Sequence, residues 1–191
     1  QSQFIFACSP EWAIEHVIRL LDIDKNEAEA QRAWDGYLSW GKWSDELLQH
    51  IRPLFQKIFK KISVLGDDED RFVEYVAGIC LYASVHPQEG NWLNDFLTNS
   101  APKTRELFSK KLQWLFRNMK TEARSLAWEK WIRDYWVNRE DGRPLKFDNA
   151  EKVDMIELGV FLDENLGEAV ELFVGSPAPI LDRSMIYHTL N

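Results

Sequence analysis

Hydrophobic residues recur at three- and four-residue spacing along nearly the whole chain, and the alternation typical of strands is almost absent. This pattern predicts helices over residues 9–21, 26–38, 44–62, 72–82, 92–97, 102–119, 121–135, 148–172 and 181–190. The longest loop is predicted between Arg139 and Phe147, where a glycine and a proline interrupt the pattern.

Polar residues at the predicted helix starts support these boundaries. Ser9, Ser44 and Thr121 are candidate N-caps, because a hydroxyl can accept a hydrogen bond from a free amide of the first turn. Asn26 and Asp148 each precede a glutamate by three residues, which is the spacing of a capping box. Pro53 falls inside the third helix and predicts a kink there.

Eight or nine helices with short connections indicate an all-α fold. Two arrangements fit: stacked helix pairs in a HEAT/armadillo-like α-solenoid, or an irregular helical bundle. The segment 33–38 resembles the segment 127–132, at an offset of 94 residues. Half of this offset matches the period of about 40–47 residues in HEAT and armadillo repeats, and we therefore favour the solenoid.

Composition fits a single globular domain over residues 1–191. The chain has 45% hydrophobic residues, a net charge of −8 and nine tryptophans, which predict a core of bulky rings. Two cysteines favour a reducing compartment, and no apolar run is long enough to span a bilayer or to act as a secretory signal. We expect a cytoplasmic location, and the start at Gln1 suggests a fragment of a larger protein.

Motifs for nucleotides and metals are incomplete. Residues 36–42 have the spacing of a phosphate loop, but Trp43 replaces the hydroxyl residue and a helix precedes the loop. Residues 22–26 start like a calcium loop, but Glu27 and Ala33 stand at positions that need glycine and an acid. The four histidines are widely spaced, and we predict no cofactor, no metal and no evident small-molecule substrate.

One enzymatic alternative remains at the carboxyl end. Arg183 and His188 are separated by four residues, a spacing that resembles the motif of all-helical HEPN ribonucleases. In that family the histidine moves a proton of the ribose hydroxyl and the arginine binds phosphate. Ser184 departs from the polar residue usual after the arginine, and chance matches to this spacing are frequent. We expect no catalysis in this chain and retain Arg183 and His188 as the alternative.

Charge is unevenly distributed. Residues 103–124 hold seven basic residues against two acids, whereas residues 148–171 hold eight acids against one lysine. These segments are either solvated faces that attract each other within the fold or a basic docking strip. For the strip we predict Lys103, Lys110, Arg117 and Arg124 as partner contacts, and overall acidity argues against nucleic acid as the partner.

Residues 33–38, with Trp43 and the Pro53-Leu54-Phe55 segment, resemble part of a helical domain of unknown function. That domain lies at the carboxyl end of large bacterial sirtuin-like proteins linked to phage defence. The resemblance implies that the NAD-cleaving part lies elsewhere in a parent chain. It also implies that this domain senses a trigger or supports assembly. We therefore predict a non-catalytic helical-repeat module that binds another protein or another domain of its parent chain.

Overall fold

The computed structural model describes residues 6–175, which form helices joined by turns, without a strand among them. The predicted all-α class is confirmed. The described residues pack as two compact units, the first ending at Leu115 and the second beginning at Phe116. The single domain over residues 1–191 stays a prediction.

From Pro10 onward, the first unit has six α-helices and three short helical turns among its described residues. Their bounds are α2 Pro10–His16, η1 Ile18–Leu21, α3 Glu27–Trp40, α4 Asp45–Phe59, η2 Ile62–Asp68, α5 Glu69–Tyr82, η3 Glu89–Asn91, α6 Trp92–Asn99 and α7 Pro102–Arg117, whose last two residues belong to the second unit.

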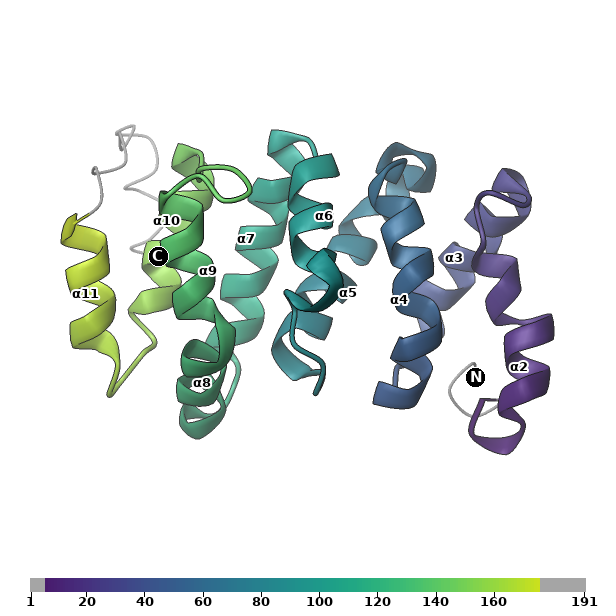
Figure 1. Ribbon diagram of the computed structural model, residues 1–191, viewed down its shortest axis with the longest axis horizontal. Coiled ribbons are helices and arrows are strands. Elements are labelled where there is room, and N and C mark those ends of the chain that lie inside the picture. Colours follow the sequence, from purple (N-terminus) through teal and green to yellow (C-terminus); the bar gives the residue numbers. More distant parts are fainter. Residues whose placement is uncertain (1–5, 176–191) are drawn as a thin grey trace. The chain divides into compact units, whose positions relative to one another are not determined.

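Alternate helices of the first unit pack against each other. Helix α3 contacts α5, and α4 contacts α6. In Figure 1, α4 and α6 lie in front of α3 and α5. This two-layer order is the one that consecutive helical hairpins produce when they stack.

Aromatic rings form the core of the first unit. Trp34 is fully buried, and its ring lies 4.9 Å from that of Phe55 and 5.6 Å from that of Phe72. The Trp34 indole nitrogen donates a hydrogen bond to the Leu21 carbonyl at 2.9 Å, so its one polar atom is paired. Further ring contacts continue this cluster through Phe59, Trp92, Phe96 and Phe108. The prediction that tryptophans build the core is correct for Trp34 and Trp92.

Two of the predicted caps in the first unit are confirmed. Side-chain oxygens of Asn26 and Ser44 accept hydrogen bonds from the third amide of their helices, each at 3.3 Å. Ser9 makes no such bond. The predicted helix over 9–21 is also interrupted, because α2 ends at His16 and a 3₁₀ turn follows.

Up to residue 175, where the described part of the second unit ends, it has four α-helices and one π-helical turn, with the bounds α8 Thr121–Ala127, η4 Trp128–Ile132, α9 Arg133–Glu140, α10 Asn149–Gly159 and α11 Leu166–Gly175. Residues 121–140 are continuously helical, as the sequence pattern predicts for most of this range. The capping box of Asp148 and Glu151 is confirmed at the start of α10. Thr121 lies inside α8 and gives no cap hydrogen bond.

The single helix predicted over 148–172 is wrong, because a turn separates α10 from α11. Gly159 explains the tight contact between these helices. A Cβ atom at this position would lie 2.2 Å from Phe173 and 3.5 Å from Ala169. Apolar periodicity continues through the turn, so the sequence pattern does not show where the chain reverses.

A fully buried ion pair connects α9 to α10. The guanidinium of Arg139 donates to Glu151 Oε1 at 2.7 Å and to the Tyr135 hydroxyl at 2.8 Å. It also donates to the carbonyls of Leu145 at 2.7 Å and Lys146 at 3.3 Å. Arg139, predicted to start a loop, therefore lies in a helix and fixes the loop that follows.

None of the helices in the part of the chain that the structure describes is long and apolar enough to cross a membrane. The tryptophans of the two similar segments, Trp34 and Trp128, are both buried in helical segments. Their hydrogen bonds differ, since Trp128 donates to the Glu168 carboxylate at 2.9 Å. The duplication stays a prediction.

Candidate functional site

The predicted contact lysines lie on α7 of the first unit. Lys103 and Lys110 are exposed and both line a groove of about 430 Å³ between α7 and the segment that starts α5. Neither lysine forms an ion pair with any residue between 6 and 175. Their spacing of seven residues places them two helical turns apart on one face, as predicted.

The opposite wall of this groove is acidic. Asp67, Glu69 and Asp70 line it, and Glu106 adds a fourth acid on α7 itself, between the two lysines. The sequence segment 103–124 is strongly basic, but the fold places acids of the preceding turn beside it. The groove is therefore a surface of mixed charge and not the purely basic strip that was one of the two interpretations of the sequence.

Part of that acidity is neutralised within the fold. Lys111 donates to Asp70 at 2.6 Å and to Glu74 at 2.9 Å. Partial burial lowers the pKa of Lys111, but the two carboxylates outweigh it and the net shift is upward. Glu69 accepts a hydrogen bond from the Thr104 hydroxyl at 2.6 Å. Lys111 therefore holds α7 against α5, while Lys103 and Lys110 remain open to a ligand.

The two predicted arginines belong to the second unit and contact side chains there. The guanidinium of Arg117 lies 5.5 Å from the centre of the Phe161 ring. Arg124 donates to Thr121 at 3.0 Å and to Asp163 at 3.4 Å, and its side chain is only 15% exposed. Attraction between the basic and acidic segments is therefore present at Arg124 and Asp163. A role of Arg117 and Arg124 in partner binding stays a prediction.

The other candidate segments have structural roles. Asp22 accepts from Lys57 at 2.6 Å, and Asp24 lies 3.2 Å from the same lysine. Burial raises the pKa of Asp22, the hydrogen bond from Lys57 lowers it, and the net shift is downward. Among the described residues, no cluster of acids, histidines and cysteines could hold a metal ion.

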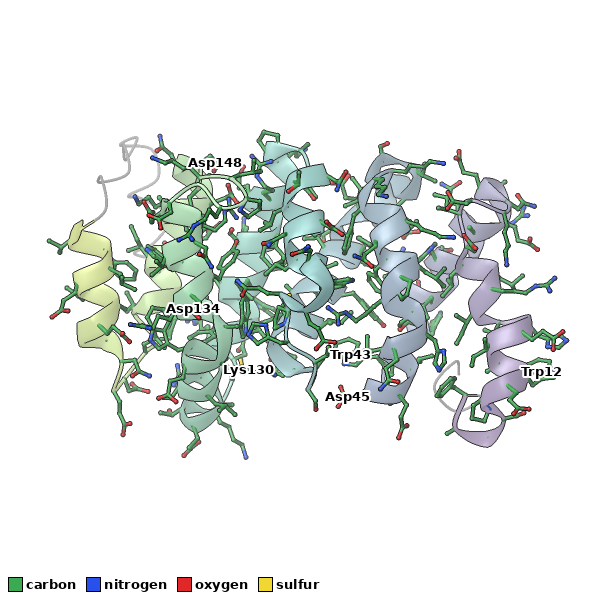
Figure 2. All side chains as sticks on the ribbon, in the orientation of Figure 1. Trp12, Trp43, Asp45, Lys130, Asp134 and Asp148 are labelled. Atoms are coloured by element: carbon green, nitrogen blue, oxygen red, sulfur yellow. The ribbon has the colours of Figure 1, made fainter. Side chains whose placement is uncertain are left out.

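Residues 36–40 complete α3 and do not form a phosphate loop. Figure 2 shows Trp43 between α4 and α5, where its ring lies 5.5 Å from that of Tyr75. A Cβ atom at Gly78 would lie 3.1 Å from the Trp43 ring, so this tryptophan packs on the helix backbone. Arg183 and His188 lie outside the described residues, and the ribonuclease alternative stays a prediction.

Sequence reasoning missed a polar cleft of about 620 Å³ in the first unit, between α4 and the segment that precedes α6. Arg52 lies 5.1 Å from the centre of the Trp92 ring and donates to the Glu89 carbonyl at 3.1 Å. Asp45 accepts from the Ser84 amide at 3.1 Å, so both contacts fix the connection to α6. No sequence motif marks this cleft, because its residues come from separate segments without a shared spacing.

Comparison with known proteins finds one family of unknown function. The model of the family described as "Domain of unknown function (DUF4020)" matches residues 79–187, which is more than half of the chain. The chain belongs to this family. No curated protein and no solved structure matches it. The match begins near the end of α5 and includes α7 with its two exposed lysines.

Proposed function

We propose that this chain is a non-catalytic helical module that binds another protein, or another part of its parent chain, through the groove beside α7. The observation that supports this most directly is the pair Lys103 and Lys110. Both side chains are exposed, unpaired among the described residues and aligned on one helix face. Exposed charges that the fold does not use are available to a partner.

The chemistry of the groove defines the partner. An acidic side chain can pair with Lys103 or Lys110, and a basic or amide group can contact Asp67 on the opposite wall. A peptide segment with both kinds of group fits this surface better than a polyanion, because the acids of the groove would repel a continuous phosphate backbone.

The order of the helices supports the helical-repeat part of the proposal. In the first unit α3 packs on α5 and α4 on α6, which is the neighbour pattern of stacked helix pairs. Stacks of this kind expose one long face of each layer, and repeat proteins commonly bind partners there.

The resemblance of residues 33–55 to the sirtuin-associated helical domain supports a more specific setting. We propose a cytoplasmic bacterial parent protein in which a separate sirtuin-like part cleaves NAD during phage defence. Measuring NAD cleavage by the complete parent chain tests this setting. A parent chain without this activity would contradict the setting and leave the interaction role intact.

A charge-reversal experiment tests the groove. The variant Lys103→Glu/Lys110→Glu should lose the partner that the unchanged chain retains from a lysate of its source organism, as identified by mass spectrometry. Its melting temperature should fall by less than about 5 °C, because neither lysine is paired in the fold and the new glutamates face the acids of the groove only at an exposed surface.

The matched control is Lys42→Glu/Lys60→Glu, which changes the net charge equally at two exposed lysines of the same unit that do not line the groove. This control should retain the partner. Equal capture by both double variants would reject the groove as the binding surface.

A further inference from the structure

The polar cleft between α4 and the segment that precedes α6 is separate from the lysine groove. It has a volume of about 620 Å³ and shares no lining residue with that groove. Among the described residues that line the cleft, Arg52 is the cation, and Asp45 and Glu89 are the acids. The fold therefore places both signs of charge around one hollow.

Arg52 is held in position by the wall of the cleft. Its guanidinium lies 5.1 Å from the centre of the Trp92 ring, and its Nη2 donates a hydrogen bond to the Glu89 carbonyl at 3.1 Å. The Trp92 indole nitrogen in turn donates to the Arg52 carbonyl at 3.4 Å. Because these contacts already order the arginine, binding a ligand there loses little side-chain entropy.

The charge of Arg52 has no carboxylate partner among residues 6–175. Nη2 contacts a neutral carbonyl and Nε is enclosed, whereas Nη1 has no partner in this range and remains accessible. Burial is the largest influence on the pKa of Arg52 and lowers it, and the charge of Glu89 opposes burial only in part. A ligand that brings a carboxylate to Nη1 would compensate this half-buried charge.

The acids of the cleft select among anionic ligands. Glu89 is exposed and forms no ion pair with a described residue, and Asp45 at the start of α4 (Figure 2) accepts from the Ser84 amide at 3.1 Å. Two carboxylates beside one guanidinium repel a dianion such as a phosphate ester. A ligand that carries one carboxylate and one ammonium complements both signs of charge.

The size of the cleft sets the size of this ligand. Ligand sites typically have volumes of about 300–1,000 Å³, and a water molecule in the liquid occupies about 30 Å³. The cleft is therefore large enough for a molecule of many heavy atoms. The exposed Pro53 and the partly exposed Val85 also line it and can contact an apolar side chain of the ligand.

We propose that this cleft binds a small zwitterion, either a free amino acid or a short peptide with free ends. The ligand carboxylate accepts hydrogen bonds from Arg52, because a guanidinium is planar and matches the geometry of a carboxylate. The ligand ammonium pairs with Glu89. The site uses residues distinct from Lys103 and Lys110, so its failure would leave the proposed partner groove intact.

The test titrates the unchanged chain with leucine and with glycyl-leucine at about pH 6.5, where both ends of each probe are ionised, and follows binding by ligand-observed NMR. At least one probe should bind saturably, and the tighter of the two identifies the source as an amino acid or a peptide. Its amidated form lacks the carboxylate and should bind at least tenfold more weakly. Its N-acetylated form lacks the ammonium and should bind at least threefold more weakly. Absence of saturable binding by both probes would overturn the proposal.

Two variants locate the charges. In Arg52→Gln the free and amidated probes should bind equally, and a preference for the free carboxylate that survives would overturn the role of Arg52. Glu89→Gln changes an exposed side chain that makes no hydrogen bond within the described chain, so the fold should be retained. This variant should bind the free and N-acetylated probes equally while it still prefers the carboxylate over the amide.

Matched controls make the same charge changes outside the cleft. Arg32→Gln in α3 and Glu46→Gln in α4 alter exposed side chains that do not line it, and both should bind the probes as the unchanged chain does. Equal losses of affinity in the controls and in the cleft variants would overturn the assignment of the site.

Discussion

The cores of the two units are built differently. In the first unit, rings of Trp34, Phe55 and Phe72 contact each other directly, and the surrounding residues are apolar. In the second unit, the rings of Tyr135 and Phe147 lie 5.6 and 4.4 Å from the Arg139 guanidinium, which pairs with Glu151; the two charged side chains are 1% and 0% exposed. Both cores contain large aromatic residues, but within residues 6–175 the fully buried ion pair Arg139–Glu151 belongs to the second.

The two cores therefore depend on different interactions. The ring cluster depends on volume and shape, so it tolerates a smaller apolar side chain at moderate cost. The pair Arg139–Glu151 stabilises the second core only when both charges are present, because removing one leaves the other buried without compensation. Burial lowers the pKa of Arg139, but Tyr135 and Glu151 outweigh burial and the net shift is upward.

The largest effect is expected for Arg139→Leu. The free energy of unfolding of the second unit should fall by about 4 kcal/mol, because Glu151 and two loop carbonyls lose their donor. Hydrogen exchange with mass spectrometry measures this for peptides of α9 and α10.

The control is Arg139→Leu/Glu151→Leu. Because no unpaired charge remains buried, the double variant should lose less than Arg139→Leu alone and much less than the sum of both single variants. Additive losses would show that the ion pair is not the stabilising element.

A smaller effect is expected for Phe55→Leu in the first unit. The side chain stays apolar but loses ring contacts with Trp34 at 4.9 Å and Phe72 at 5.0 Å, so stability should fall by about 1.5 kcal/mol. Urea unfolding followed by hydrogen exchange in α4 and α5 measures it. A loss as large as that of Arg139→Leu would remove the distinction between the two cores.

The smallest effect concerns acid pH. The pKa of Asp22 is lower in the folded state than its ordinary value of 3.8. The stability that ionised Asp22 adds to the fold is therefore fully present above pH 3.8 and is lost as the pH falls through the folded-state pKa. Glu168 in the second unit behaves alike, because hydrogen bonds from Trp128 and Arg133 lower its pKa while slight burial opposes them.

The free energy of unfolding should fall between about pH 5 and pH 3 in the unchanged chain. In Asp22→Asn this fall should be smaller, by less than about 1 kcal/mol. Urea unfolding at both pH values checks this, with Asp24→Asn as the neighbouring control. An increase in the pH dependence of Asp22→Asn would contradict the assigned direction.

Much of the fold could be predicted because helices follow local rules. The apolar stripes of α4, α5 and α7 and the caps at Asn26, Ser44 and Asp148 match the sequence pattern. The break between α10 and α11 could not be predicted, because it depends on a contact between Gly159 and a ring fourteen positions later. Periodicity reports which face of a helix is apolar and does not report where a helix turns back.

The candidate site was predicted only in part for the same reason. The sequence identified Lys103 and Lys110 on one helix face, and the structure shows both exposed in one groove. Counting charge along the chain missed the acids near residue 67, which approach α7 only after folding. The sequence pattern groups Arg124 with these lysines. In the structure Arg124 contacts Asp163, which lies 39 positions later in the chain, and local spacing does not predict this contact.

The sequence by itself determined the all-helical class, most helix boundaries and the abundance of rings in the core, because these depend on neighbours within about one helical turn. Only the tertiary structure decided that Arg139 is buried and that the groove has mixed charge. These features arise from side chains on separate segments. Their energies depend on distance and burial, and spacing along the chain encodes neither.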